Sequence, residues 1–385
     1  MSGGAPLPSG TRVGLNLVFL TPGATGGMET YARQLIPELA AAAPDLELVA
    51  FVNSAAAAGP GPWHDVTRCV EVPVDALNRI EWVRAEQFLL PRAARRARID
   101  LMHSFASTAP VWGPFRRVVT IHDLIYRTVP DAHPGLRSLG MRVLVPAAAR
   151  RSHRIIVDAA STRDDLQTFL RVAPGKVDVV PLGVGTPPAT DPEPEPQLRE
   201  RLGAGERTIV LSVSAKLAHK NLPRLIAAVA RIPAESRPLL VLPGYPTPHE
   251  EELRIQIAEL GLTDHVRLLG WVSEAELEGL YRATGAFVFP SLAEGFGLPV
   301  LEAMVRGVPV ACSDRGSLAE VAGDAALLFD PESVTAIAEA MTRLLDDRQL
   351  AARLVEAGRE RAAGFSWHAT AAGTLAAYGR ALARA

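Results

Sequence analysis

Short apolar runs alternate with stretches of helical periodicity along nearly the whole chain. Apolar runs without polar alternation are typical of strands buried on both faces, as in parallel sheets. Between them, apolar residues recur at spacings of three and four, which indicates amphipathic helices. The predicted fold is therefore α/β with doubly wound parallel sheets. We expect strands at 13–20, 46–52, 99–104, 118–121, 154–158, 177–184, 208–214, 239–244, 265–272, 286–291 and 308–312, and helices at 28–39, 78–98, 250–260, 334–345 and from 367.

A proline-rich, acidic stretch separates two halves of similar pattern. Residues 186–196 contain five prolines among acidic residues, a composition that resists packing. The chain has 385 residues, which is too long for one typical core. We therefore predict a first domain at 1–185, a linker at 186–199 and a second domain at 200–366. The small-residue stretch 54–62 is predicted to be a loop.

The composition is that of an ordinary globular protein. The net charge is −2 and charged residues make up 21%, so there is no basic excess and nucleic acid is not an expected partner. Cys69 and Cys312 lie in different halves without metal-ligand spacing, which favours a reducing cytoplasm. The N-terminal residues lack the charged start and apolar core that are typical of a signal peptide, so none is expected. No uncharged apolar run approaches the roughly 18 residues of a membrane span.

The stretch from Glu294 to Glu302 carries the strongest chemical signal. It follows a predicted strand, and Pro299 suits the first turn of a helix. Gly295 and Gly297 would let a ligand approach the backbone, and the amides of a helix N-terminus favour a phosphate. The two flanking carboxylates would repel a phosphate unless they accept hydrogen bonds from sugar hydroxyls. The pattern favours a phosphorylated sugar, and the alternative is a tight turn capped by acidic residues.

The stretch Glu294-Gly-Phe-Gly-Leu-Pro, together with Glu302, resembles the signature of the retaining glycosyltransferases of family 4, in which seven residues separate the two glutamates. This resemblance implies the GT-B fold, in which two Rossmann-like domains face across a cleft and the terminal helix (367–385) crosses back to the first. It also implies that Glu302 holds the ribose, that Glu294 holds a hydroxyl of the donor sugar, and that Gly295, Phe296, Gly297 and Leu298 line the donor.

Three groups in the first half are candidates for the acceptor side. Gly26 and Gly27 resemble the family's N-terminal glycine loop, whereas glycines at 23, 26 and 27 do not fit the nicotinamide fingerprint. His122 and Asp123 end an apolar strand, and the resemblance places the histidine beside the donor sugar, with a histidine hydrogen-bonded to local backbone as the alternative. Asp123 would orient that imidazole or cap the next turn. His103 ends another strand and would contact the acceptor, with a packed histidine as the alternative.

Two lysines in the second half are candidates for the diphosphate. Lys216 and Lys220 flank a strand-to-helix turn, where cations and helix amides meet phosphates. The resemblance assigns Lys220, but Ala215 stands where the family has arginine, and Lys216 is one place late. Lys216 would supply the missing charge from a shifted position, and the alternative for either lysine is a salt-bridged surface residue. Trp271 and Val272 lie in the turn at the end of the stretch 265–272, and the resemblance places them near the nucleotide base, with an indole packed in the core as the alternative.

The function expected from this resemblance is transfer of a sugar from a nucleotide diphosphate sugar to an acceptor hydroxyl with retained configuration. The acceptor would be a glycan, a lipid-linked molecule or a small molecule. Residues 120–134 are similar to mannosyl- and rhamnosyltransferases of polysaccharide synthesis. His122, Lys220 and Glu294 would carry the chemistry without a metal or other cofactor, since no Asp-x-Asp pair follows a strand. A phosphorylase or synthase on the same fold, and a nucleotide-sugar sensor, are the alternatives.

Two arginine-rich stretches, at 78–98 and 137–154, raise the question of membrane contact. Basic amphipathic helices can press against anionic lipid at the inner face of a membrane. The alternative is a solvated helical face, which Pro91 and Pro146 favour because they interrupt any long stripe. The sequence does not indicate an oligomeric state.

Overall fold

The computed structural model describes residues 7–23, 25–129 and 136–383, without the side chains of 136–139. Residues 130–134, the end of the stretch 120–134, lie outside this description. So do the first side chains of the basic stretch 137–154. The chain divides into two compact units. The first holds the described residues up to Arg127, those from 136 to Gly183, and those from Ser366. The second is formed mainly by Val184–Phe365.

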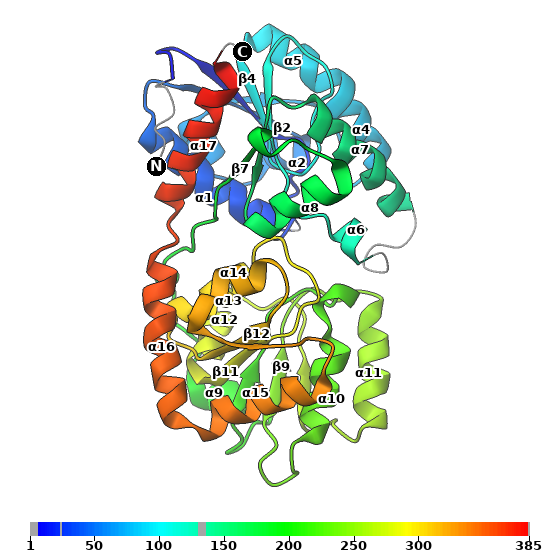
Figure 1. Ribbon diagram of the computed structural model, residues 1–385, viewed down its shortest axis with the longest axis vertical. Coiled ribbons are helices and arrows are strands. Elements are labelled where there is room, and N and C mark those ends of the chain that lie inside the picture. The colour runs from blue at the N-terminus through cyan, green and yellow to red at the C-terminus, as the bar shows by residue number, and fades with distance from the viewer. Residues whose placement is uncertain (1–6, 24, 130–135, 384–385) are drawn as a thin grey trace. The chain divides into compact units, whose positions relative to one another are not determined.

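The first unit is built on a seven-stranded sheet in which all paired neighbours are parallel. Helices lie on both faces of this sheet (Figure 1). In sheet order the strands are β3 (Arg68–Glu71), β2 (Glu47–Val52), β1 (Arg12–Leu17), β4 (Leu101–Ser104), β5 (Arg116–Thr120), β6 (Arg154–Val157) and β7 (Val177–Val179).

The helices of the first unit include a broken one where a single helix was predicted. Residues 79–97 form α4, a π-helical turn η1 and α5, and Pro91 stands in the first turn of α5, where a missing N–H is tolerated. The helices are α1 (Gly27–Ala42), α2 (Ser54–Ala58), α3 (Trp63–Val66), α4 (Arg79–Arg84), η1 (Ala85–Leu89), α5 (Leu90–Ala97), α6 (Ile125–Thr128), α7 (Leu136–Arg151), α8 (Ala160–Leu170), η3 (Pro174–Lys176) and α17 (Trp367–Leu382).

The prediction of a loop at 54–62 is wrong for its first half, because α2 begins at Ser54. The buried Asn53 accepts a hydrogen bond from the Ala56 amide at 2.8 Å, and its own amide donates to the carbonyl oxygens of Val18 and Leu20. Asn53 is thus a helix cap held in place by the turn after β1. The cap was visible in the sequence, but its anchoring partners are 33 and 35 residues away.

The second unit has a six-stranded parallel sheet with the order β10-β9-β8-β11-β12-β13. Its helices also cover both faces (Figure 1). The strands are β8 (Ile209–Leu211), β9 (Leu239–Leu242), β10 (Val266–Leu268), β11 (Thr284–Phe289), β12 (Val310–Ser313) and β13 (Leu327–Phe329). The helices are α9 (Glu195–Leu202), η4 (Ala218–Lys220), α10 (Leu222–Arg231), α11 (His249–Glu259), α12 (Glu274–Ala283), α13 (Leu298–Val305), α14 (Ser317–Ala322), η5 (Gly323–Ala325), α15 (Val334–Asp346) and α16 (Arg348–Ala363).

Two doubly wound α/β sheets confirm the predicted fold class. Helix α12 begins with a capping box, in which Ser273 and Glu276 bond each other's backbone amides. Helix α9 begins at Glu195 and buries Leu198 and Leu202, so ordered packing resumes before the end of the proline-rich stretch.

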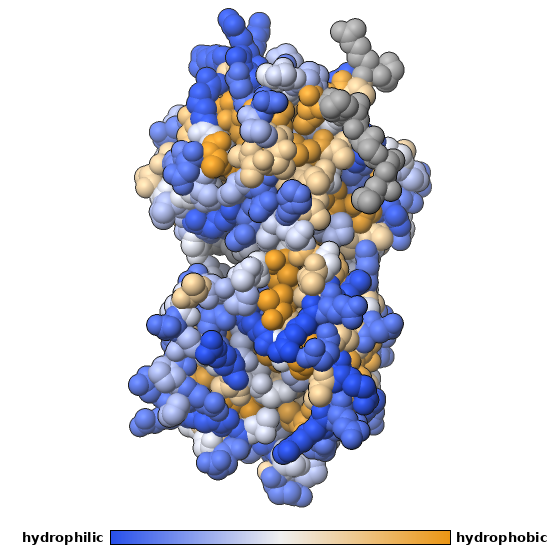
Figure 2. Space-filling model, turned by 90° about the vertical axis from the view of Figure 1, so that its left-hand side faces the viewer, coloured by the Kyte–Doolittle hydropathy of each residue, from blue (hydrophilic) through white to orange (hydrophobic). Residues whose placement is uncertain are grey.

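The C-terminal helix α17 packs within the first unit, against α1 and strands β4, β5 and β6. In the described part of the chain no helix is long and apolar enough to cross a membrane. On the face drawn in Figure 2, hydrophobic side chains are interspersed with hydrophilic ones in both units.

Candidate functional site

In the second unit the stretch Glu294–Glu302 links the central strand β11 to helix α13. Gly297 stands directly before the helix with φ of +115°, and a Cβ there would lie 2.6 Å from Leu318. The positive φ favours glycine, and any larger residue would also have to push the end of the Leu318 side chain aside. Phe296 is buried and packs edge-on against Phe365, with ring centroids 5.8 Å apart. The loop is therefore anchored on both sides of Gly297. Leu298 begins α13 without a side-chain cap, Pro299 has no N–H, and the Val300 amide donates to the Gly297 carbonyl at 3.0 Å.

Lys220 and Glu294 form an ion pair at this edge of the sheet. The Lys220 Nζ lies 2.6 Å from Glu294 Oε1, and both side chains retain some exposure, 15% and 10%. Lys220 ends η4, after β8, and Glu294 follows β11, and these two strands are neighbours. The strand order reverses between them, and in open α/β sheets ligands bind at such a reversal, outside the carboxyl ends of the strands.

Glu302 lies on α13 with a different set of partners. Its carboxylate is 3.5 Å from the Tyr281 hydroxyl, and its backbone carbonyl accepts from Arg306. Burial raises the pKa of Glu302, an effect that the nearby Arg306 charge and the Tyr281 hydroxyl oppose. Arg306 is held in turn by Glu278, through Nε at 3.0 Å from both carboxylate oxygens. The prediction that Glu294 and Glu302 hold one donor molecule stays a prediction.

The glycine loop of the first unit is open on its outer side. Gly26 precedes α1 with φ of +62°, and a Cβ on Gly26 or Gly27 would meet no atom within 4 Å. The loop is anchored by Glu29, whose carboxylate accepts from the Gly23 amide at 2.8 Å and pairs with Arg33. The backbone at Gly26 and Gly27 is thus accessible, as their predicted role requires.

His122 follows β5 and is bound by protein groups at both ring nitrogens. Nδ1 lies 2.7 Å from Asp158 Oδ2, and Nε2 lies 2.9 Å from the Phe105 carbonyl oxygen. A carbonyl can only accept, so Nε2 carries a proton. Burial lowers the pKa of His122, but the Asp158 carboxylate and the Phe105 carbonyl outweigh it and raise the pKa above its ordinary value. Burial raises the pKa of Asp158, because it disfavours the charged carboxylate.

Asp123 does not orient the imidazole. Its carboxylate accepts from the Ile125 amide at 2.9 Å, so the alternative role, capping the next turn, is the one the structure has. The orienting residue is Asp158, which sequence reasoning missed. Asp158 directly follows the apolar strand β6, so its position at the same sheet edge as His122 was a usable signal.

The structure does not support a ligand-binding role for His103. Its side chain is fully buried, with Nδ1 at 2.8 Å from the Tyr378 hydroxyl and Nε2 at 2.8 Å from the Thr120 hydroxyl. Burial, with a smaller contribution from His122, lowers the pKa of His103 to about 3. His103 is the packed histidine that the alternative interpretation described, and it ties α17 to the sheet.

Lys216 does not supply the charge missing at Ala215. Its side chain is fully buried, and Nζ donates to the carbonyl oxygens of Gly244 and Leu269 and pairs with Glu250. A phosphate would have to displace these three acceptors. Trp271, by contrast, is 68% exposed and packs on Tyr245 with ring centroids 4.7 Å apart, while Val272 is half-buried beside it.

Comparisons with known proteins match this arrangement over most of the chain. The model described as glycosyl transferases group 1 matches residues 195–361, and that of Glycosyltransferase Family 4 matches residues 25–186. The chain is 32% identical over 268 residues to the O-antigen chain mannosyltransferase B of Escherichia coli, covering 68% of this chain and 70% of that one. The chain belongs to the group 1 glycosyltransferases.

Solved structures of glycosyltransferases share the fold of this one. Sucrose-phosphate synthase from Thermosynechococcus elongatus matches with a TM-score of 0.75 and 25% identity, over 94% of this chain and 96% of the other. HepE from Anabaena, solved in complex with UDP-glucose, matches with a TM-score of 0.73 and 20% identity, over 95% and 98%. The predicted GT-B fold is confirmed, and this glycosyltransferase transfers sugars in glycoconjugate synthesis.

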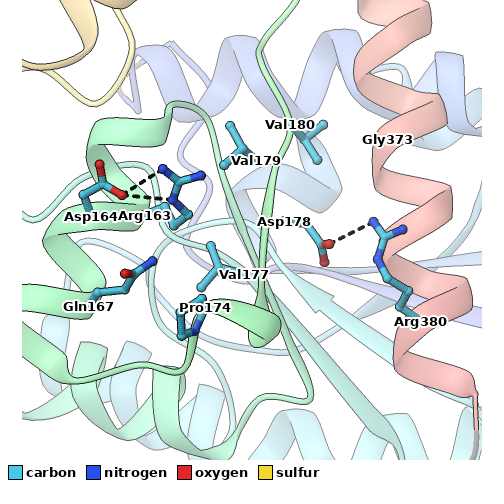
Figure 3. A pocket seen from close by; sticks show the side chains of 10 residues that line it. All are labelled: Arg163, Asp164, Gln167, Pro174, Val177, Asp178, Val179, Val180, Gly373 and Arg380. Atoms are coloured by element: carbon cyan, nitrogen blue, oxygen red, sulfur yellow. Dashed lines mark hydrogen bonds and ion pairs between the residues drawn. The ribbon is translucent and has the colours of Figure 1, made fainter. Parts of the chain in front are cut away.

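A cavity of about 540 Å³ in the first unit of this glycosyltransferase contains none of the predicted site residues. It lies along β7, between α8 and α17, and Figure 3 shows Arg163, Asp164 and Gln167 on one side of the strand and Asp178 paired with Arg380 on the other. Arg154 also binds Asp178, so this carboxylate is already neutralised by two arginines. Among the described residues no group of three His, Cys, Asp or Glu side chains could hold a metal ion.

Proposed function

We propose that this glycosyltransferase moves a sugar, of mannosyl or rhamnosyl type, from a nucleotide diphosphate sugar to an acceptor hydroxyl with retention of configuration. The acceptor would be a growing glycan, a lipid-linked molecule or a small molecule. The observation that carries the proposal is the Lys220–Glu294 pair at the strand-order reversal of the second sheet. The similarity to a mannosyltransferase and to a structure solved with UDP-glucose supports the donor class.

The ion pair suggests how the donor would be bound. An incoming diphosphate would take Glu294's place beside Lys220 Nζ, and the positive end of the α13 dipole would favour its charge. Glu294 would then be free to accept from a hydroxyl of the sugar, and Glu302 from the ribose. Before the exchange, the pair keeps both charges compensated, since each is largely removed from water.

The reaction itself would depend more on stabilising the negative charge of the leaving diphosphate than on an acid that protonates it. The bond between the anomeric carbon and the phosphate oxygen breaks, the acceptor oxygen bonds to the same face of that carbon, and the departing phosphate oxygen takes the acceptor's proton. We propose that Lys220 supplies this stabilisation without a metal. His122 would contact the sugar through Nε2 by exchanging the Phe105 carbonyl for a sugar oxygen.

Two substitutions test the proposal directly. Glu302→Ala should weaken donor binding, measured by calorimetry with nucleotide sugars chosen from a thermal-shift screen. Lys220→Ala should lower turnover by about 10² or more, as for a lost charge-stabilising donor. Unchanged donor affinity in Glu302→Ala would contradict the assignment. NMR of the product's anomeric proton tests retention, and unchanged turnover in EDTA tests metal independence.

We also propose that this glycosyltransferase works in the cytoplasm and touches the inner face of an anionic membrane through the surface of α4, η1 and α5. Leu77, Ile80 and Phe88 are exposed there at 73%, 75% and 54%. The arginines at 84, 92, 95 and 96 are exposed on the same helices. Apolar side chains next to arginines suit the boundary between headgroups and acyl chains.

Vesicle sedimentation tests the membrane contact. The wild type should sediment with vesicles containing phosphatidylserine at low salt and be released as salt rises, because surface charge attraction is screened. Ile80→Ser with Phe88→Ser should reduce binding at all salt concentrations, whereas Leu260→Ser, at an exposed residue of the second unit, should not. Recovery that is independent of salt and of Ile80 would contradict the contact.

A further inference from the structure

Lys216 ties together three turns that follow three neighbouring strands. Its backbone follows β8, and Nζ donates to the Gly244 carbonyl after β9 at 2.8 Å and to the Leu269 carbonyl after β10 at 2.5 Å. The third partner, Glu250 in the first turn of α11, lies 3.3 Å away. One ammonium group therefore contacts the carboxyl ends of β9 and β10 and the following helix at once.

The backbone of these turns is fitted closely around the lysine. The Lys216 amide donates to the Tyr245 carbonyl, its carbonyl accepts from the Thr247 hydroxyl, and the Gly244 amide donates to the Gly270 carbonyl. Gly244 has φ of +148°, and a Cβ there would lie 1.9 Å from the Ser214 carbonyl oxygen. With so little free space, displacement of one turn would move the other two.

The electrostatic situation makes Lys216 hard to replace. Burial lowers its pKa, while the charge of Glu250 and the hydrogen bond to it raise it again. Glu250 also pairs with Arg254, so its carboxylate is shared between two cations. An uncharged side chain at 216 would leave two carbonyl oxygens without their donor in a buried position. The lysine is thus fully engaged in holding protein groups.

These turns present side chains to the outside of the sheet edge. Tyr245 follows Gly244, and the exposed Trp271, which packs on Tyr245, follows Gly270. We propose that Lys216 is a positioning residue that holds the turns after β9 and β10 as one rigid wall on the nucleoside side of the donor site, and that it does not contact the donor phosphates. This inference rests on the proposed function, because it places the donor at the carboxyl edge of the second sheet.

The number of phosphates on the nucleotide separates a positioning role from phosphate contact. Calorimetry would compare the wild type, Lys216→Met and, as matched control, Lys220→Met with UMP, UDP, GMP and GDP, at a temperature where circular dichroism shows each variant folded. In Lys216→Met, affinity for the mono- and the diphosphate should fall by the same factor, about tenfold, since the turns loosen. In Lys220→Met, the diphosphate should lose about tenfold or more and the monophosphate much less.

The possible outcomes are distinct. A loss in Lys216→Met that grows from mono- to diphosphate, as in Lys220→Met, would overturn the positioning role, and so would unchanged affinity for both. If neither variant changed nucleotide binding, the proposed donor site itself would be wrong. Should Lys216→Met fail to fold, Glu250→Gln serves instead, because it keeps Lys216 but weakens the ion pair that anchors it. This variant should lower the affinities for the mono- and the diphosphate by one factor. It should also raise acrylamide quenching of Trp271 fluorescence, measured as the difference from Trp271→Phe.

Discussion

In each unit a buried carboxylate at the sheet edge holds a neighbouring cationic side chain, but the two cations differ. In the first unit Asp158 pairs with His122, and in the second Glu278 pairs with Arg306. A histidine can lose its proton when its partner is lost, whereas an arginine cannot. The edge of the first sheet can therefore respond to pH, and the edge of the second keeps a fixed charge beneath Glu302.

Removing each carboxylate should give the largest difference between the units. Glu278→Ala removes the carboxylate that pairs with the largely buried Arg306 guanidinium, and it should destabilise the second unit by about 3–5 kcal/mol. Asp158→Asn leaves His122 able to become neutral and keeps a side chain that can hydrogen-bond, so it should cost about 1–3 kcal/mol. Urea unfolding of both variants measures these free energies. Equal losses would contradict the distinction between the two pairs.

A change of pH should act on the first unit in two directions. The pKa of His103 is about 3, below its ordinary value of 6.5, so the folded unit binds this proton less readily than the unfolded chain. Stability from His103 is therefore present above pH 6.5 and is lost as the pH falls toward 3. The pKa of His122 is raised, so its contribution is complete below 6.5 and is lost as the pH rises through the folded value.

Single substitutions separate these two limbs. His103→Gln should flatten the fall in unfolding free energy on the acid side, and His122→Gln the fall on the alkaline side, measured by urea unfolding at intervals from pH 4 to 9. A wild-type profile without either limb would show that neither histidine keeps its shifted pKa in solution.

The smallest expected effects come from one helix cap in each unit. Ser273→Ala removes the exposed capping box of α12 and should cost about 1 kcal/mol. Asn53→Ala removes the cap of α2 and also leaves the buried carbonyls of Val18 and Leu20 without a donor, so it should cost about 2 kcal/mol or more. Thermal unfolding of the two variants, with Ser54→Ala beside Asn53 as a control, measures the difference.

The sequence predicted most of the fold because buried parallel strands give continuous apolar runs. Residues 118–121 and 286–291 are examples: the structure has β5 and β11 there, and the edge of each sheet carries the polar residues expected of it. The motif Glu294–Glu302 likewise predicted a strand-to-helix turn, and the structure has one there, since Gly297 and Pro299 have local conformational reasons. Local propensity and periodicity were sufficient for these features.

The tertiary structure decided which groups each charged side chain contacts. Lys216 and Lys220 look alike in the sequence, four residues apart in one turn, yet one is buried among carbonyls 28 and 53 residues away and the other faces Glu294. Asp123 and Asp158 are equally plausible partners for His122, and the pairing of β5 with β6 selects Asp158. Strand order, which brings distant residues to one edge, is not encoded in any local pattern. The sequence alone therefore determined the fold class, while the contacts of each charged side chain were decided by the tertiary structure.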